Sequence, residues 1–336
     1  SSCQCSRVDQ TPLRCSTSAQ IPTQTVASTG YAETHRVQLP PMDAGQTNRF
    51  YVVSADRAGN VTTNDNHGQW YTFVTTQAAS ALLLYTPEAT WDQAFGDFLG
   101  LYPGIENWTQ PLDEIRVPYE IWDVGERGTP TAADLAPFRV VLWRPEELGD
   151  LPAGMQTALT GYMAQGGALF VCSYDLLTRL ALPSDAAFRT GVLHLASWKE
   201  DQGADLVEGE PGDPVGGGLS LSLDYSAFPD ASLFGINWPD GVDFIQPTAD
   251  AIGCFHEAFG AGTGGTVGVR YPKTGVDSTN RVVFCTFPLE AVPLDAPAPD
   301  NRVTFLANVL EFLVPGLSGT AHVTLDRPAY SVPGSF

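Results

Sequence analysis

The chain has very little lysine and no long hydrophobic run, and both absences narrow the classes of function. Its 336 residues include 17 basic and 38 acidic side chains, a formal net charge of −21, and the lysines are Lys199 and Lys273. A surface this acidic repels phosphate backbones and anionic lipid headgroups. No stretch of about 18 apolar residues occurs, so no membrane-spanning helix is predicted. We therefore expect neither nucleic-acid binding nor membrane insertion.

Cysteine is also scarce, and its six copies fall into two groups. Cys3, Cys5 and Cys15 lie close together near the start of the chain. We expect a disulfide among them, with the pairing left open, because three thiolates without a nearby histidine are a poor zinc pattern. The other three cysteines lie in apolar runs and are expected to be buried free thiols. The three cysteines near the start of the chain, with the disulfide expected among them, favour an oxidising, extracellular compartment.

Residues 1–77 are rich in β-strand patterns and have no helical period. Three segments carry the pattern, Thr34 to Leu39, Arg49 to Asp56 and Gln69 to Thr76, with turn residues between them. They predict the second half of an antiparallel β-sandwich. We expect the first strands of this module to be short or missing, so that it is incomplete at its N-terminus.

The loop between the last two of these segments is crowded with side-chain oxygens. Asp56, Asn60 and Asp65 are candidate ligands for calcium, a cation that takes six to eight oxygens. The alternative is that Asp, Asn and Gly simply form turns here. No other cofactor is expected.

From residue 81 to residue 175, short apolar runs alternate with segments of helix length. The runs are Ala81 to Tyr85, Tyr119 to Trp122, Phe138 to Trp143 and Ala168 to Cys172. Continuous apolar strands separated by helices predict an α/β, doubly wound, mainly parallel sheet that is covered on both faces.

Helices are predicted between these strands and near the end of the chain. Apolar residues recur at helical spacing between Trp91 and Leu99, and a short helix is expected from Ala132 to Ala136. A longer helix is predicted to bury its face made of Met155, Leu159, Tyr162 and Met163. Asp300 is predicted to cap a final helix that contains Val303, Leu306 and Leu310.

The rest of the chain is less regular. Residues 181–250 are rich in Gly, Pro and Asp and predict an insertion packed against one edge of the sheet. Strand patterns return at Ala251 to Glu257, Gly265 to Tyr271 and Arg281 to Phe287. Residues 317–336 alternate like a strand and predict the start of a further β module, or a tail.

A set of residues in the first 77 positions matches a known pattern. They are His35, Val37 and Leu39, then Ser54, Asp56, Ala58, Gly59 and Asn60, then Tyr71, Phe73, Thr75 and Thr76. In this order they resemble the C-terminal half of a bacterial fibronectin type III domain. The resemblance implies a β-sandwich module.

Short motifs also recur between residues 80 and 316. They are Tyr-x-x-Trp-Asp at 119–123, Gly-x-Pro-Thr at 128–131, Val-Val-Leu-Trp at 140–143, Gly-Gly-Ala-Leu-Phe at 166–170 and Arg-Val-Val-Phe at 281–284. This part resembles the class I glutamine-amidotransferase-like fold, a flavodoxin-like arrangement. It is most similar to a non-catalytic subgroup found in secreted multidomain bacterial surface proteins.

Enzymes of this fold carry a cysteine at a tight strand-to-helix turn and a later histidine and carboxylate, which implies Cys172, His256 and Glu257 as the positions to compare. A nucleophile turn needs glycine-like neighbours, whereas Val171 and Ser173 flank Cys172. Adjacent residues of a strand face opposite sides, so His256 and Glu257 cannot both face one cysteine. We therefore expect no catalytic residue. A cysteine hydrolase using Cys172 remains the weaker alternative.

Other residues with chemical potential have structural explanations. Glu290 is expected to cap a loop or to pair with an arginine such as Arg281 or Arg302. Trp122 and Trp143 are expected in the core. The tryptophans in loop-like contexts are candidate stacking surfaces for a glycan, and these are Trp91, Trp108, Trp198 and Trp238.

Together these patterns predict a non-catalytic structural or interaction segment of a secreted or cell-surface multidomain protein. Its role is scaffolding, assembly or adhesion, and its partners are other protein modules, copies of itself or a glycan. The N-terminus has no apolar leader, so we expect that a leader has been removed or that the chain is a piece of a longer protein. The alternative is an accessory region of a secreted hydrolase, either a protease or a carbohydrate-active enzyme, whose catalytic domain lies outside these residues.

Overall fold

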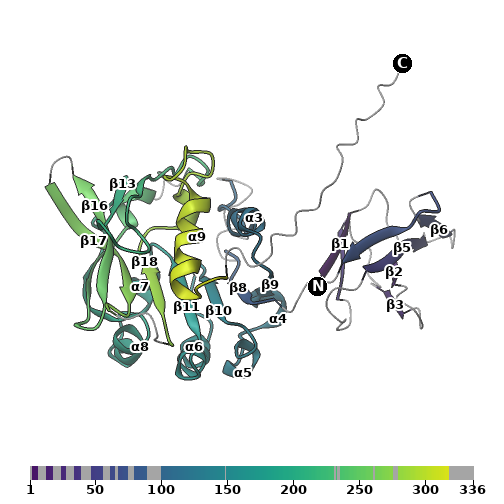
Figure 1. Cartoon of the computed structure of the whole chain (residues 1–336), viewed down its shortest axis with the longest axis horizontal. Coiled ribbons are helices and arrows are strands. Elements are labelled where there is room, and N and C mark those ends of the chain that lie inside the picture. Colours follow the sequence, from purple (N-terminus) through teal and green to yellow (C-terminus); the bar gives the residue numbers. More distant parts are fainter. Residues whose placement is uncertain are drawn as a thin grey trace, which may run out of the picture. The chain divides into compact units, whose positions relative to one another are not determined.

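The computed structural model divides into two compact units, Ser1–Ala79 and Ser80–Phe336 (Figure 1). The residues that the structure describes are 2–6, 13–17, 24–27, 34–38, 47–55, 61–64, 67–74, 79–88, 100–147, 149–230, 232, 235–259, 262–274 and 279–317. The predicted helix at 91–99 and the predicted β module at 317–336, apart from its first residue, therefore lie outside the described residues.

The described part of the first unit consists of antiparallel strands. They are β1 (Ser2–Ser6), β2 (Leu13–Thr17), β3 (Gln24–Ala27), β4 (Thr34–Gln38), β5 (Thr47–Ala55), β6 (Val61–Asn64) and β7 (Tyr71–Val74). β1 pairs with β4, β2 pairs with β3 and β5, and β5 also pairs with β6 and β7. The three strands expected from alternation are β4, β5 and β7. The strands before them are short rather than missing. The side chains of Cys3, Cys5 and Cys15 lie outside the described part.

A nine-stranded mixed sheet forms the centre of the second unit, in the order β14-β13-β16-β17-β18-β11-β10-β8-β9. Its strands are β8 (Ala81–Tyr85), β9 (Tyr119–Asp123), β10 (Val140–Arg144), β11 (Ala168–Cys172), β13 (Leu206–Gly209), β14 (Ser220–Ser222), β16 (Ile252–Phe259), β17 (Gly262–Tyr271) and β18 (Val282–Cys285). From β9 to β18 neighbouring strands are parallel. The remaining pairs are antiparallel. The predicted α/β fold is confirmed, but the sheet is mixed rather than mainly parallel as predicted, because four of its eight strand pairs are antiparallel.

Both faces of this centre are buried, which explains its continuous apolar strands. Along β8, Ala81 and Leu83 belong to one core cluster, whereas Leu82 and Leu84 belong to the other. Successive side chains of a strand point to opposite faces, so one apolar run supplies both clusters.

Different helices cover the two faces. α3 (Glu106–Ile115) and α9 (Arg302–Leu313) contribute to the first cluster, and α6 (Met155–Ala164) contributes to the second. The four residues predicted for the buried face of α6, which are Met155, Leu159, Tyr162 and Met163, are all buried, as expected. The shorter helices are α4 (Val124–Arg127), α5 (Ala132–Leu135), α7 (Leu176–Arg179) and α8 (Ala186–Gly191), with single turns η1 (Pro183–Asp185), η3 (Trp238–Gly241) and η4 (Leu289–Ala291).

The segment 181–250 is more ordered than its composition suggests. It contributes β13 and β14 to the far edge of the sheet, and β12 (Leu195–Lys199) pairs with β15 (Phe244–Pro247) in a separate two-stranded sheet. These strands have three to five residues each. Such short strands between turns leave little periodicity in the sequence.

The last described helix, α9, begins one residue later than predicted. Asn301 is its N-cap, and its side-chain oxygen accepts from Thr304 N at 2.9 Å. Asp300 instead accepts from Ser220 N at 2.7 Å and so holds the edge strand β14. The prediction of Asp300 as the cap was wrong because two adjacent residues, both good caps, compete for the position.

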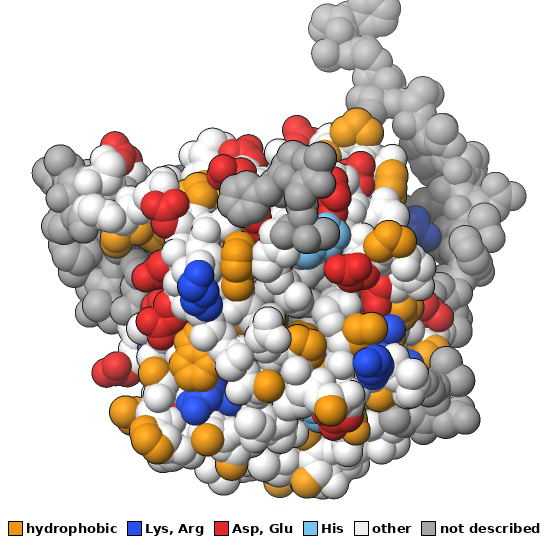
Figure 2. Space-filling view, turned by 90° about the vertical axis from the view of Figure 1, so that its left-hand side faces the viewer, with side chains coloured by type: hydrophobic (Ala, Val, Ile, Leu, Met, Phe, Trp, Pro, Cys, Tyr) orange, Lys and Arg blue, Asp and Glu red, His pale blue; other side chains and the backbone are white. Residues whose placement is uncertain are grey.

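The surface of the second unit is acidic, in keeping with the net charge of −21. Figure 2 shows acidic side chains spread over the upper and left-hand part of one face, with few basic ones among them. Among the described residues, no helix combines the length and the apolar character needed to cross a membrane.

Candidate functional site

The carboxyl ends of β8 and β10 mark the point where the strand order of the parallel sheet reverses. β8 lies between β9 and β10, so the chain forms β9 on one side of β8 and then crosses to the other side for β10. In open α/β sheets, ligands bind at such a switch point, outside the carboxyl ends of the strands. The residues that follow these two strands are therefore the first candidates for a site.

Arg144 ends β10, and its guanidinium forms a charged triad with Glu88 and Glu290. Its Nη1 lies 2.9 Å from Glu88 Oε1 and donates to Thr86 O at 2.7 Å, and its Nε donates to Glu290 Oε1 at 3.1 Å. All three charged side chains are only 1% exposed. Burial opposes the charge of Arg144, but Glu290 and Glu88 outweigh it and raise the pKa of the guanidinium. Removing one member would leave a buried charge without its partner.

Glu290 links this triad to α3 and α9. Its Oε1 also accepts from Trp108 Nε1 at 3.0 Å, and its carbonyl oxygen accepts from Arg302 Nη2 at 2.7 Å. Glu290 was expected to cap a loop or to pair with an arginine such as Arg281 or Arg302, and its carboxylate does pair with an arginine, although with neither of these two. The partner is Arg144, and Arg281 donates to Phe312 O instead.

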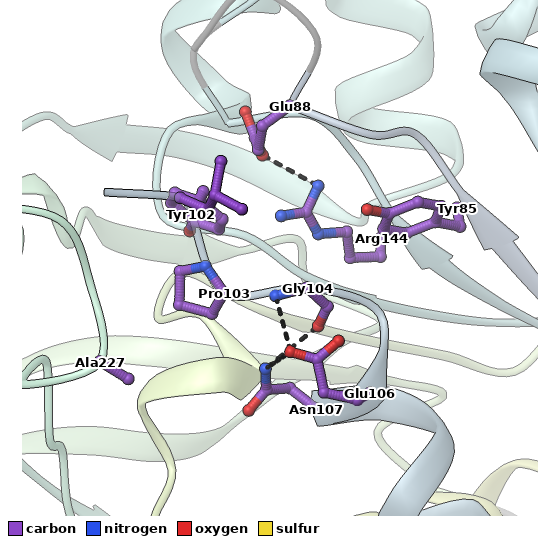
Figure 3. A pocket seen from close by; sticks show the side chains of 10 residues that line it. Tyr85, Glu88, Tyr102, Pro103, Gly104, Glu106, Asn107, Arg144 and Ala227 are labelled. Carbon is purple, nitrogen blue, oxygen red and sulfur yellow. Dashed lines mark hydrogen bonds and ion pairs between the residues drawn. The ribbon is translucent and has the colours of Figure 1, made fainter. Parts of the chain in front are cut away.

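A pocket of about 510 Å³ opens beside the triad and is called the switch-point pocket below (Figure 3). Glu88 and Arg144 form part of its wall, and Glu106 and Asn107 from the start of α3 add further polar groups. The remaining lining residues are aromatic, apolar or glycine, and they are Tyr85, Leu101, Tyr102, Pro103, Gly104 and Ala227. Both strand ends at the switch point therefore contribute to one cavity.

Glu147 is a third enclosed carboxylate, next to the triad. Its Oε2 accepts from Ser173 Oγ at 2.6 Å and lies 3.5 Å from Arg179 Nη2, and its main-chain N–H donates to Glu88 Oε1 at 2.7 Å. Burial raises the pKa of Glu147 to about 8, although Arg179 acts in the opposite direction. The side chain is therefore largely protonated at neutral pH.

Several buried polar atoms around these carboxylates have no hydrogen-bond partner. They are Thr86 Oγ1, Tyr102 Oη, Arg144 Nη2 and Tyr174 Oη. Burial raises the pKa of both phenols, and Glu147 raises it further. An unsatisfied buried polar atom costs about 1–3 kcal/mol and is rare, so several together make this part of the molecule costly to bury.

Cys172 occupies the end of β11, where the resembled enzymes carry their nucleophile. The thiol has no exposed surface and donates to Phe287 O at 2.8 Å. Burial raises its pKa, so the unreactive protonated form dominates at neutral pH. Its neighbour across the β11–β18 pair is Cys285, another buried thiol. This environment does not activate a nucleophile.

His256 and Glu257 lie on β16, which β17 and β18 separate from β11. Three strand spacings amount to roughly 14 Å, too far for contact with Cys172. His256 Nδ1 lies 3.0 Å from Glu210 Oε1, and Nε2 lies 3.8 Å from Glu208 Oε2. The carboxylate of Glu257 is buried on the other side of the strand. The structure therefore does not bring these three residues together.

The candidate calcium ligands Asp56, Asn60 and Asp65 lie outside the described residues. In the part of the chain that is described, no group of three or more His, Cys, Asp or Glu side chains is arranged to hold a metal ion.

The burial of the tryptophan side chains differs in part from the prediction. Trp122 and Trp143 are buried, as expected, but Trp108 and Trp238 are buried as well and offer no stacking surface. Trp198 is half-buried under the guanidinium of Arg189, whose carbon lies 4.7 Å from the ring centroid. Trp91 lies outside the described residues.

Sequence reasoning missed Arg144, Glu88 and Glu147. One signal was available, since each follows or ends a continuous apolar strand at the carboxyl edge. Arg144 directly follows the run Val140 to Trp143, where a charged residue is costly unless it is paired. The partners could not be read in this way, because Glu290 lies 146 residues further along the chain.

Comparisons with known proteins add little to this description. No protein-family model matches the chain, and no curated protein matches it either. A solved ThuA-like protein from Bacteroides uniformis is similar over 73% of this chain and 95% of its own, with a TM-score of 0.40 and 11% identity. A structure described as the mmIFT52 N-terminal domain is similar over 70% and 98%, with a TM-score of 0.39 and 10% identity. Matches at this level establish neither a family nor an activity.

Proposed function

We propose that the chain is a non-catalytic interaction segment of a secreted or cell-surface multidomain protein. The observation that carries the proposal is the enclosed thiol of Cys172, which donates to Phe287 O and has a raised pKa. Because the position expected for a nucleophile is closed, and its expected partners lie on a distant strand, binding accounts for this fold better than hydrolysis.

In this proposal the two units are separate modules of an extracellular protein. Residues 1–77 form a fibronectin type III-like module, and residues 80–316 form an amidotransferase-like domain without catalytic residues. The division of the chain into two compact units supports a modular protein. The role is scaffolding, assembly or adhesion.

The acidic surface bears on the choice of partner. Copies of a chain with a net charge of −21 repel each other at low ionic strength, so a module with a basic surface is the favoured partner. Binding to such a module weakens as salt is added, whereas self-association strengthens, because salt screens attraction and repulsion alike. Sedimentation velocity at low and high salt distinguishes binding to a basic module from self-association.

Alkylation tests the non-catalytic assignment directly. Iodoacetamide at neutral pH is expected to leave Cys172 unmodified in the folded chain and to modify it after unfolding, as read by peptide mass spectrometry. The buried Cys254 and Cys285 serve as internal references for an enclosed thiol. Rapid modification of Cys172 alone in the folded chain would reveal a reactive thiolate and contradict the proposal.

A further inference from the structure

Three buried thiols lie on one face of the central sheet. Cys172 ends β11, Cys285 ends β18 and Cys254 lies on β16, strands that Figure 1 shows close together in the sheet. All three side chains belong to the same core cluster, have no exposed surface and are free thiols in this structure. The proposed interaction role uses none of them, so their arrangement calls for its own explanation.

Cys172 and Cys285 are direct neighbours in the parallel pair formed by β11 and β18. They lie opposite each other in the register, and their side chains point to the same face because both belong to the same core cluster. Neighbouring strands lie about 4.7–4.9 Å apart, and a disulfide joins residues whose Cα atoms are about 4.4–6.8 Å apart. The backbone therefore already holds these two cysteines at the separation that a disulfide requires.

The two thiols also interact with each other. Burial raises the pKa of both, and a hydrogen bond between them lowers the pKa of Cys172 and raises that of Cys285, so Cys285 is the donor. Cys172 in turn donates to Phe287 O at 2.8 Å. Bonding the two sulfur atoms therefore requires the loss of their hydrogens and a rotation of the Cys172 side chain away from Phe287 O.

Cys254 is the alternative partner, but a whole strand separates it from Cys285. The residue opposite Cys285 on β17 is Gly268, and β16 lies beyond β17. Two strand spacings amount to roughly 9–10 Å between Cα atoms, which is too long for a disulfide. Cys254 therefore stays a free thiol and serves as an internal control.

We infer that Cys172 and Cys285 form a cross-strand disulfide when the chain folds in the presence of a low-molecular-weight disulfide such as glutathione disulfide. The thiolate of one cysteine attacks this reagent, forms a mixed disulfide and releases one glutathione, and the second cysteine then displaces the other glutathione as the protein S–S bond forms. Two protein thiols are oxidised, and one glutathione disulfide is reduced to two glutathione thiols that carry the two protons.

The exchange takes place before the two strand ends are enclosed by the rest of the fold. In the folded chain both sulfur atoms are buried, and burial keeps both thiols protonated. A protonated, inaccessible thiol neither attacks a disulfide nor is attacked. Once formed, the bond is protected from external thiols in the same way.

The bond joins the two strands whose following residues build the carboxyl edge. Ser173 follows β11 and donates to Glu147, whereas Glu290 follows β18 and pairs with Arg144. A disulfide between these strand ends closes a long loop of the chain and stabilises the fold mainly by restricting the unfolded state. The position where the resembled enzymes carry their nucleophile thus becomes half of a structural cross-link.

Disulfide mapping of the full chain tests the inference. The chain is unfolded with reductant and refolded in a buffer of reduced and oxidised glutathione, and free thiols are then alkylated under denaturing conditions. Trypsin places Cys172, Cys254 and Cys285 in different peptides, because basic residues lie between them, and these include Arg179, Lys199, Arg270 and Arg281. Mass spectrometry without reductant is expected to show the peptides of Cys172 and Cys285 linked and Cys254 alkylated. Alkylated Cys172 and Cys285, or a bond to Cys254, would overturn the inference.

Two matched variants measure the effect of the bond on stability. Cys285→Ala removes one half of the pair, and Cys254→Ala is the same change at a fully buried thiol outside it. Oxidised samples of the parent chain and of Cys254→Ala should melt higher than their reduced samples, and this difference should exceed that of Cys285→Ala by about 5 °C or more. Oxidation of the cysteines near the start of the chain is common to all three proteins and cancels. An equal difference in all three contradicts the cross-link.

The inference and the proposed function fail separately. Alkylation of Cys172 is carried out on the reduced, folded chain, so it reports the reactivity of the thiol whether or not the oxidised chain contains the bond. A reactive thiolate there contradicts the non-catalytic assignment, whereas a missing bond contradicts only this inference. The mapping uses the parent chain and decides the question even where Cys285→Ala does not fold.

Discussion

The protonation state of Glu147 tests whether this part of the sheet's carboxyl edge is closed to solvent. Burial raises its pKa from 4.5 to about 8, so between these values the unfolded chain is ionised at this residue while the folded chain still holds a proton. The folded state then binds more protons than the unfolded state, and stability falls as pH rises through this window. At 1.36 kcal/mol per pKa unit, the ceiling of the loss is about 5 kcal/mol at pH 8 and above.

Glu147→Gln removes the ionisation but keeps an oxygen that can accept from Ser173 Oγ. We expect the variant to be more stable than the parent chain at pH 8 by at least about 1 kcal/mol, and to show no advantage near pH 4.5. Urea unfolding followed by tryptophan fluorescence from pH 4.5 to 8.5 measures this difference.

Asp243 is the matched control, because burial raises its pKa only to about 7. Asp243→Asn should therefore alter the pH dependence of stability mainly below pH 7 and change the slope between pH 7 and 8 less than Glu147→Gln does. If Glu147→Gln and the parent chain give parallel stability curves over the whole range, the carboxylate of Glu147 is solvated and the reasoning about the enclosed edge fails.

Three further predictions concern buried charge, the thiol and the last helix. Arg144→Met leaves two buried carboxylates unpaired and should lower the free energy of unfolding by about 3–5 kcal/mol, whereas Arg127→Met, at an exposed ion pair, should cost less than about 1 kcal/mol by the same urea titration. Cys172→Ser places a hydroxyl in a site that burial makes apolar, and it should lower the free energy of unfolding by about 1–3 kcal/mol in the same urea titration. Asn301→Ala should cost about 1 kcal/mol, whereas Asn301→Asp, which still caps the helix, should cost little in the same measurement.

The parallel centre of the sheet could be predicted because its signal is local. β8, β10 and β11 are continuous runs of mostly apolar, buried residues, and burial on both faces requires such a run, whereas the edge strand β9 is only partly buried. Helix α6 could be predicted equally well, because its four buried residues recur at helical spacing in the sequence. The strands of the segment 181–250 were not, since β13 and β14 have four and three residues and their apolar partners lie on β16 and elsewhere in the chain.

The site was harder to predict than the fold because its residues pair over long distances. A charged residue at the end of an apolar strand, such as Arg144, indicates that a partner exists but does not identify it. Glu290 was recognised as a residue that pairs with an arginine, yet the choice among Arg144, Arg281 and Arg302 depends on which strand ends meet in space. The parallel register of β10 with β8 and β11 decides this, and no local pattern specifies it.

The carboxyl edge of the sheet is closed at one part and open at another, and side-chain chemistry accounts for the difference. Beside β11 and β18 the residues are apolar, and Phe287 packs against Phe255 and Phe305, so this part fills like any core and encloses Cys172. Beside β8 and β10 the charged triad cannot be packed in the same way, because each charge needs partners at fixed geometry and one guanidinium nitrogen remains unpaired. Apolar packing thus shields the thiol of Cys172 from solvent, whereas the switch point has a cavity with charged residues in its wall. The same edge therefore combines a filled part around Cys172 with a cavity at the switch point.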